Sequence, residues 1–274
     1  MIGNGIYSVL KDKYSLVLVY RDKKKLKILE RVWGKTKQHK LICFDINDIN
    51  EDINNLKKLI QKIGPIDAVI NCAGIINKYS DNDILKTFFV NSIFPQLLSR
   101  EYKEKFINIT TDCVFSGKTG FPYTEKSIIS VSDAYGMSKW LGEPEESLIL
   151  RTSTIGLEIA NFAGLLEWTR KQKGKTIKGF ANQYWSGITN RELGKVCDRI
   201  IQNRSSFPKN GIYHIFGEKI SKYEMLRKFN KKYNLGCTII KDTTVKCNRT
   251  LATIYNINKK LKIPSFDEML NDLK

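Results

Sequence analysis

The sequence predicts an α/β protein built on a doubly wound parallel sheet, with a smaller lobe formed by the C-terminal part of the chain. Two observations carry this prediction. In the first half, short apolar runs alternate with segments whose apolar residues recur at helical spacing. The second half continues this alternation less regularly and contains no linker, repeat or low-complexity tract. Strands separated by helices imply right-handed crossovers and parallel pairing.

Each predicted element has its own pattern. Residues 15–20 and 40–44 are strand-like apolar runs, and the apolar residues of 53–63 recur with a helical period. We divide the chain into a sheet domain (residues 1–155) and a substrate lobe (residues 156–274) that is partly interleaved with the sheet. Further strands are predicted at residues 66–70, 105–109, 147–153 and 211–216, and further helices at 4–13, 84–100, from 135 onward, 162–171, 189–203 and 221–234.

Composition describes a globular protein of 274 residues, with 42% hydrophobic residues. No apolar run is long enough to cross a bilayer, and the N-terminus lacks the pattern of a signal peptide, so we expect a cytoplasmic protein. The formal net charge of +18 fits either a nucleic-acid or membrane-surface binder or an ordinary lysine-coated surface. Lysines far outnumber arginines and are spread along the chain. We therefore expect neither nucleic acid nor membrane as a partner.

The six cysteines are scattered and form no C-x-x-C pair, and the two histidines, His39 and His214, are far apart. These residues predict reduced thiols in the core rather than disulfides, and no metal site.

The strongest functional signal is a Tyr and a Lys four residues apart, Tyr135 and Lys139, that follow a strand ending in Thr110 and Thr111. Residues at this spacing share one face of a helix, and a hydroxyl at a strand end can point at the same place. Such a trio offers one carbonyl oxygen a proton donor, a cation and a second hydrogen-bond donor. An ordinary amphipathic helix surface is the alternative. The spacing alone is weak, because it also occurs at Tyr7/Lys11, Tyr20/Lys24 and Tyr255/Lys259.

Part of a dinucleotide-binding pattern is present at the N-terminus. Such sheets open with a strand and a G-x-x-G-x-x-G turn, whose glycines let the backbone approach a pyrophosphate at a helix N-terminus. Met1-Ile2-Gly3 looks like the end of that turn. We therefore expect Gly3 to face the cofactor in a Rossmann-like sheet whose first strand is missing. A start inside a longer reading frame and a real loss of the strand both fit this pattern.

Two further strand ends fit the adenosine half of a cofactor. Arg21 follows the strand of residues 15–20, where a site for NAD would carry Asp or Glu. Arg21 therefore favours NADP over NAD, with a solvated turn as the alternative. Asp45 and Ile46 follow the next strand and are candidates for contact with adenine.

The strand of residues 66–70 leads into Asn71, Ala73 and Gly74, where the chain of such a fold passes close to its cofactor. Gly74 would allow that close approach because it lacks a side chain. Asn91 lies in the middle of a predicted helix, where Asn is unfavourable. It either bonds across to a strand or faces water.

The chain resembles the extended short-chain dehydrogenase/reductase superfamily. Within it, the chain is most similar to the dTDP-4-dehydrorhamnose reductase-like group of sugar-nucleotide reductases. The resemblance spans essentially the whole chain, apart from the missing first strand and glycines. It is carried by residues 110–117 (TTDCVFSG), 123–125 (YTE), 135–143 (YGMSKWLGE), 150–153 (LRTS), 182–189 (NQYWSGIT), 211–214 (GIYH) and 247–251 (CNRTL).

The resemblance implies that NADPH delivers hydride to C4 of a 4-keto-6-deoxy sugar on a nucleoside diphosphate, in polysaccharide precursor synthesis. Tyr135 would be the general acid, Lys139 would lower the pKa of that phenol and hold the nicotinamide ribose, and Thr111 would orient the carbonyl. Arg249 would bind the diphosphate, with a surface ion pair as its alternative. Substrate contacts would come from Thr111, Val114, Phe115, Trp185 and Arg249.

Three other functions are alternatives to that of a reductase. A 4,6-dehydratase would need a second carboxylate after Asp112, where this chain has Cys113, and we therefore disfavour it. A sugar-nucleotide 4-epimerase uses the same trio and stays open, as does a non-catalytic nucleotide-binding regulatory subunit. A homodimer is also left open.

Overall fold

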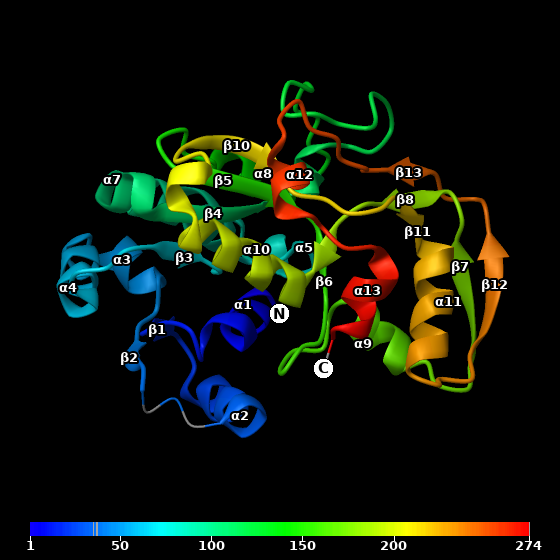
Figure 1. The fold of residues 1–274 in the computed structure, drawn as a ribbon, viewed down its shortest axis with the longest axis horizontal. Coiled ribbons are helices and arrows are strands. Elements are labelled where there is room, and N and C mark those ends of the chain that lie inside the picture. The colour runs from blue at the N-terminus through cyan, green and yellow to red at the C-terminus, as the bar shows by residue number, and fades with distance from the viewer. Residues whose placement is uncertain (35, 37, 274) are drawn as a thin grey trace.

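The computed structural model describes residues 1–34, 36 and 38–273, and its centre is a four-stranded parallel sheet (Figure 1). Neighbouring strands that are distant in sequence confirm the predicted crossovers. The register places Thr111 opposite Thr152, so two adjacent strands end at the same edge of the sheet. In pairing order, the strands are β10 (Gly211–His214), β5 (Leu148–Thr152), β4 (Phe106–Thr111) and β3 (Val69–Asn71).

A second, two-stranded parallel sheet consists of β1 (Val17–Tyr20) and β2 (Lys40–Cys43). α2 (Lys23–Trp33) connects these strands and is capped by Asp22, whose side chain accepts from the backbone N–H groups of Lys24 and Lys25. Among the residues that the structure describes, no strand pairs with both β1 and β3. The doubly wound sheet is therefore divided at the position where the sequence pattern lacks a strand.

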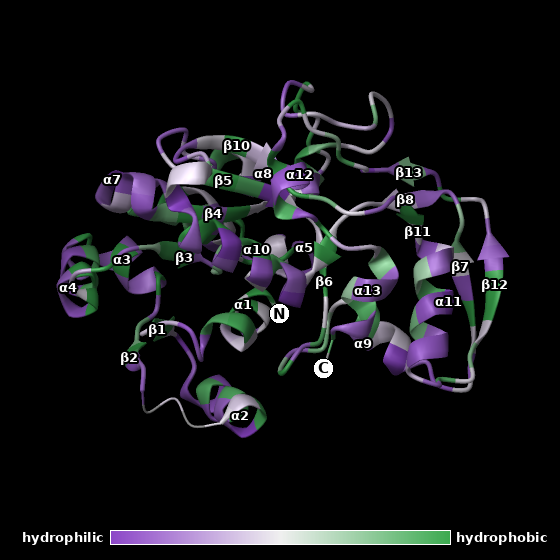
Figure 2. Cartoon of the chain, viewed as in Figure 1, coloured by the Kyte–Doolittle hydropathy of each residue, from purple (hydrophilic) through white to green (hydrophobic). Residues whose placement is uncertain are grey.

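Helices cover both faces of the central sheet. On one face, α1 (Ile2–Leu10) and α10 (Asn190–Gln202) pack on Ile107, Ile109 and side chains of β5. On the other face, the cluster around Phe106 includes α3 (Asn47–Glu51), α4 (Asn54–Ile63) and α7 (Phe94–Tyr102). Alternate residues of β4 thus face opposite layers, as expected of a strand buried on both sides. Figure 2 shows hydrophobic residues along the central strands and hydrophilic residues on the outer helices.

The helix predicted at residues 84–100 has three parts: α6 (Ile84–Phe88), a π-helical segment (Phe89–Ile93) and α7. The π segment contains Asn91, which is fully buried. Its side-chain oxygen accepts from the backbone N–H of Ile75 at 2.8 Å, and its amide donates to Ile75 O at 2.9 Å and to Ser138 Oγ at 3.0 Å. Asn91 therefore does not face water. It bonds across to the segment after β3, whereas the expected partner was a strand.

The second half of the chain contributes to both layers. β10 and α10 belong to the central sheet and its helices, while most of the remaining elements form the lobe at the right of Figure 1. Ser221 and Glu224 form a capping box at the start of α11 (Lys222–Lys232), the helix predicted at residues 221–234. The other elements here are β6 (Thr154–Ile155), α9 (Leu165–Arg170), β7 (Thr176–Phe180), β8 (Gln183–Trp185), β9 (Ile188–Thr189), β11 (Ile220–Ser221), β12 (Thr238–Asp242), β13 (Cys247–Asn248), α12 (Ile257–Leu261) and α13 (Phe266–Asn271).

The lobe is held together by short strand pairs and one apolar cluster. β8 lies between β11 and β13, β12 pairs with β7, and β6 pairs with β9. The cluster joins α9, α11 and α13 around Phe229 and Phe266. The division of the chain after residue 155 stays a prediction, since β10 returns to the sheet.

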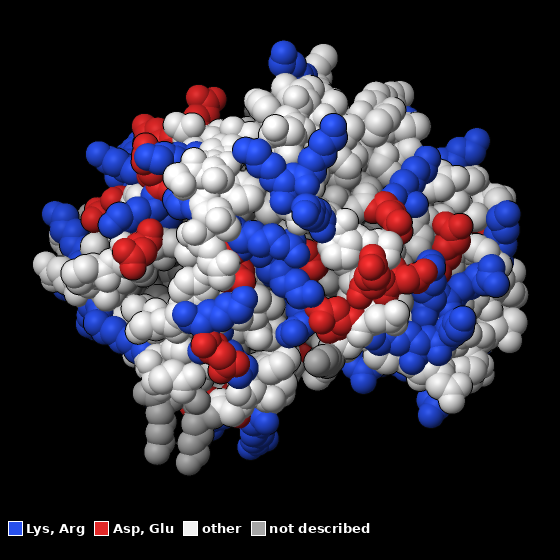
Figure 3. Space-filling model, in the orientation of Figure 1, with Lys and Arg blue, Asp and Glu red and all other residues white. Residues whose placement is uncertain are grey.

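Surface charge is distributed rather than concentrated on the face shown in Figure 3, where Lys and Arg cover both halves and Asp and Glu interrupt them. The six cysteines are free thiols, and of these Cys197 and Cys237 are buried. Within residues 1–34, 36 and 38–273, every helix is too short or too polar to span a bilayer.

Candidate active site

The carboxyl end of β4 supplies the first part of the candidate site. Thr111 ends the strand and is buried, and its hydroxyl accepts from the backbone N–H of Cys113 at 3.1 Å. This bond caps a single 3-10 turn, Asp112–Val114, which turns the chain away from the sheet. The Thr111 side chain is therefore fixed at the sheet edge, as its position in the sequence predicts.

α8 (Ala134–Leu141) carries Tyr135 and Lys139 and is wedged against two neighbours. Its N-cap Asp133 accepts from the backbone N–H of Gly136 at 2.7 Å. A Cβ on Gly136 would lie 2.4 Å from the carbonyl oxygen of Cys113, so only glycine lets the helix rest directly on the turn after Thr111. That contact brings Tyr135 beside Thr111. Tyr135 itself is half-buried, whereas Lys139 is buried.

The electrostatics of this pair differ from the sequence expectation. Burial raises the pKa of Tyr135, and Cys113 adds to this rise, while a hydrogen bond with Thr111 opposes it. The expected lowering of the pKa of Tyr135 by Lys139 is therefore wrong in this structure. Lys139 instead donates from Nζ to the carbonyl oxygen of Ile109 at 2.9 Å, and burial lowers the pKa of Lys139 to about 8.

A buried ion pair lies just beyond α8. Arg151 of β5 donates from Nε and Nη2 to the two carboxylate oxygens of Glu143, at 2.8 and 2.6 Å. Thr110 of β4 also donates to Glu143, at 2.7 Å. Glu143 acts on Lys139 as well, because its charge works to raise the pKa of that amine against burial.

The end of β3 approaches the same place. Asn71 is buried, donates to Asn108 Oδ1 at 2.9 Å and accepts from the backbone N–H of Ala73 at 3.0 Å. A Cβ on Gly74 would lie 3.3 Å from Asn91 Oδ1 and 3.9 Å from Lys139 Nζ. The structure thus brings the segment predicted to line the cofactor next to the predicted catalytic Lys.

The remaining predicted cofactor residues lie at the ends of β1 and β2 and at the start of α1. Arg21 and Asp45 face each other, with Arg21 Nε 3.9 Å from a carboxylate oxygen of Asp45. Ile46 is the N-cap residue of α3. Gly3 lies beside the segment after β3, since a Cβ there would be 3.5 Å from Cys72 Cβ.

Three of the predicted substrate residues pack in the interior of the protein. The side chains of Val114 and Phe115 are fully buried, and Phe115 stacks on Tyr123 with ring centroids 4.2 Å apart. Trp185 is also buried and packs edge-on against Phe266 in the lobe core. Contact of these three residues with a substrate therefore stays a prediction, and an apolar residue next to a site motif can also belong to the core.

Arg249 does reach the site. It donates from Nε to the carbonyl oxygen of Phe115 at 2.9 Å and from Nη1 to the thiol of Cys113 at 3.6 Å. Burial works to lower the pKa of Arg249, but Cys113 and Asp112 outweigh it and raise that pKa. The alternative of an exposed surface ion pair does not describe this contact.

Lys222, the first residue of α11, was missed by the sequence reasoning. Burial lowers its pKa, and the charges that act on it include those of Cys247, Arg249 and Asp112. It thus adds a second cation on the Arg249 side of the site. No local pattern marked it, because its position depends on how the lobe folds back onto the sheet.

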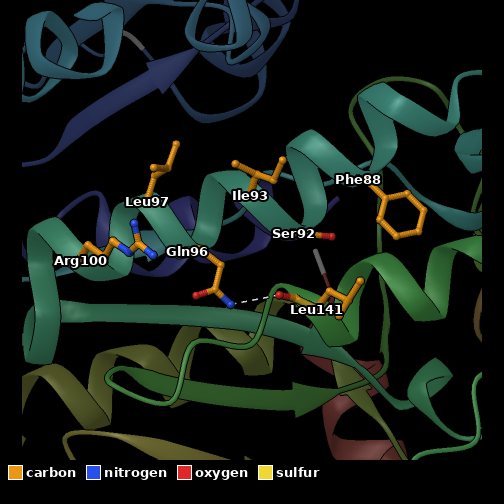
Figure 4. Close-up of a pocket in the computed structure, with 7 residues that line it drawn as sticks. All are labelled: Phe88, Ser92, Ile93, Gln96, Leu97, Arg100 and Leu141. Carbon is orange, nitrogen blue, oxygen red and sulfur yellow. Dashed lines mark hydrogen bonds between the residues drawn. The ribbon is translucent and has the colours of Figure 1, made fainter. Parts of the chain in front are cut away.

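A hollow of about 380 Å³ lies away from these residues, between α7 and the end of α8 (Figure 4). Across it, Gln96 donates to the carbonyl oxygen of Leu141 at 3.0 Å. None of the predicted site residues line it. Its lining residues are Phe88, Ser92, Ile93, Gln96, Leu97, Arg100 and Leu141.

A Tyr-x-x-x-Lys helix seated at the carboxyl edge of a parallel, doubly wound sheet defines a Rossmann-like protein of the extended short-chain dehydrogenase/reductase type. The family match is more specific. The chain belongs to the RmlD substrate binding domain family, whose model matches residues 30–253.

Known relatives agree with this assignment. The chain is 27% identical over 204 residues, 70% of each chain, to the spore coat polysaccharide biosynthesis protein SpsK of Bacillus subtilis. It is 28% identical over 200 residues, 66% of each chain, to the dTDP-4-dehydrorhamnose reductase of Aggregatibacter actinomycetemcomitans. The dTDP-4-dehydrorhamnose reductase of Bacillus anthracis, solved in complex with NADP, shares the fold with a TM-score of 0.71. That likeness is 18% identical and covers 95% of this chain and 98% of the other.

Proposed function

We propose that this chain reduces a 4-keto-6-deoxy sugar linked to a nucleoside diphosphate, with NADPH as the hydride donor, in polysaccharide precursor synthesis. The observation that carries the proposal is the seating of α8, through Gly136, on the turn after Thr111. The names of the relatives support the substrate class and the pathway, and the NADP in the related Bacillus anthracis enzyme supports the cofactor.

The residues at the strand ends fit a nicotinamide dinucleotide. Gly74 offers bare backbone beside Lys139 Nζ, so a ribose placed there meets a donor without a side chain in the way. Arg21 would hold the 2′-phosphate, and Asp45 and Ile46 would line the adenine. The cofactor, when bound, supplies a hydride to the sugar carbonyl carbon.

The side chains of the chain itself supply the proton and the polarisation. Tyr135, whose pKa is raised by burial, is protonated at neutral pH, and it gives its proton to the carbonyl oxygen as that oxygen gains negative charge. Thr111 would donate a hydrogen bond to the same oxygen. Lys139 is mostly charged at neutral pH and would hold the nicotinamide ribose. Arg249 and Lys222 would face the diphosphate.

Loss of NADPH absorbance with a dTDP-linked 4-keto-6-deoxy sugar tests the proposal. Turnover that is lost in Tyr135→Phe supports it. Tight NADPH binding without turnover would indicate a regulatory subunit, and interconversion of the C4 epimers of a sugar nucleotide without net loss of NADPH would indicate an epimerase. Either result would overturn the reductase proposal.

A further inference from the structure

The Glu143 carboxylate joins three elements of the site. Glu143 lies two residues after the end of α8, and it accepts from Thr110 on β4 and, through two bonds, from Arg151 on β5. The side chains of Arg151 and Glu143 are only 3% and 2% exposed. Thr110 and Arg151 are also register partners in the sheet, so the carboxylate is held at one level of two adjacent strands.

That level is next to the residues proposed to do the chemistry. Thr110 precedes Thr111 in β4, and Ile109, whose carbonyl oxygen accepts from Lys139, precedes Thr110. Glu143 lies about one helical turn after Lys139. One side chain therefore ties the helix that carries Tyr135 and Lys139 to the strand that carries Thr111.

Stability alone is a weak reason for such a group. A buried ion pair can often be replaced by packed apolar side chains without loss of stability, because desolvation of two charges offsets their attraction. α8 is also short, with eight residues, and it is fixed at its start by the Asp133 cap. Beyond the other end of α8, Glu143 forms an ion pair with Arg151 of the sheet.

We propose that Glu143 is a positioning residue of the reductase site. Its hydrogen bonds with Thr110 and Arg151 set the distance between Tyr135 and Thr111. This inference rests on the proposed function. Glu143 touches no substrate and acts only through the residues that do. A misplacement of a catalytic group by about 1 Å can cost roughly 100-fold in rate. Loss of the hydrogen bonds of Glu143 should therefore lower kcat more than it raises the KM for the sugar nucleotide.

Thr110 provides the sharpest test, since its hydroxyl is bound to Glu143 and the ion pair survives its removal. We expect Thr110→Val to lower kcat by about 10- to 100-fold with KM changed less than about threefold. Thr110→Ser restores the donor and should recover most of the lost kcat. Ser99→Ala is the matched control, because it also removes one buried hydroxyl bond, to Ser147 at 2.7 Å, on a helix packed against the same strand.

A kcat for Thr110→Val equal to that of Ser99→Ala would overturn the proposal, as would an equal loss in Thr110→Ser. The wild-type assay separates this result from failure of the proposed function. If the wild-type chain turns over no sugar nucleotide, the function fails and the positioning role is judged by NADP⁺ titration of Glu143→Gln. A dissociation constant raised about tenfold would still support the role, since Lys139 depends on Glu143, and an unchanged constant would overturn it.

Discussion

Lys139 donates its hydrogen bond to the carbonyl oxygen of Ile109, at 2.9 Å, and its charge is supported by Glu143 rather than by a phenolate at Tyr135. The Lys is therefore anchored to the strand that ends in Thr111. Burial of the amine brings its pKa to about 8, close enough to neutrality for its charge to change within the working range of an enzyme. This relationship shapes the expected pH dependence of the reaction.

We expect the rate of sugar reduction to fall as the pH rises through about 8. Lys139 is charged below that pKa and neutral above it, and a neutral amine holds the hydroxyl groups of the cofactor ribose less strongly than an ammonium group does. A profile of kcat/KM against pH checks this. In Glu143→Gln, loss of the supporting charge should move the alkaline limb to lower pH. A limb that moves to higher pH would contradict the assignment.

Tyr135→Phe should lower kcat by about 10²- to 10⁴-fold while leaving NADPH binding unchanged, because it removes the proton donor and little else. Tyr255→Phe is the matched control, since Tyr255 and Lys259 have the same spacing but lie far from the site in sequence. Steady-state assays and calorimetric titration measure the two quantities. Equal activity of the two variants would remove Tyr135 from the mechanism.

Much of this site could be predicted from local patterns. The strand ending in Thr111 is a clear apolar run, and Tyr135 and Lys139 have the four-residue spacing of one helix face. Parallel topology places the ends of neighbouring strands on one edge of the sheet. The orientation of Lys139 could not be predicted, because it depends on burial and on a carbonyl group of another element. For the same reason the expected effect of Lys139 on the pKa of Tyr135 was wrong.

The short strands of the lobe could not be predicted for a different reason. β6, β9, β11 and β13 have only two residues each, too few to show an alternating pattern. Phe115 and Trp185 are apolar residues beside recognisable motifs, and composition does not distinguish a pocket wall from a core. Only the packing of Phe115 against Tyr123, and of Trp185 against Phe266, identifies them as core residues.

Arg21 should decide the preference between the two nicotinamide cofactors. Its guanidinium lies 3.9 Å from Asp45 and stays more than half exposed, so it is free to bind a 2′-phosphate. Replacement by Gln should weaken NADPH binding by roughly 10- to 100-fold, the value of one charge-assisted hydrogen bond, and leave NADH binding nearly unchanged. Lys27→Gln, on the helix that follows, is the control. Equal losses for NADPH and NADH would show that Arg21 does not read the phosphate.

Asp112 should make the folded state less stable above about pH 6. Burial raises its pKa from 3.8 to about 6, so between these values the folded chain binds more protons than the unfolded chain. Stability must then fall as the pH rises through that window. Asp112→Asn removes the buried charge, and near pH 7 it should be more stable than the wild type by on the order of 1 kcal/mol.

Urea denaturation of Asp112→Asn and the wild type at several pH values measures this difference. The advantage of the variant should shrink toward about pH 4, where the wild-type carboxyl is protonated in the folded state and desolvation has little effect. Thr111 and Cys113 contact this carboxyl only at 3.4 and 3.7 Å, so the amide loses little hydrogen bonding. If the variant were instead less stable than the wild type near pH 7, attraction to Arg249 would have to outweigh the cost of burying the carboxylate.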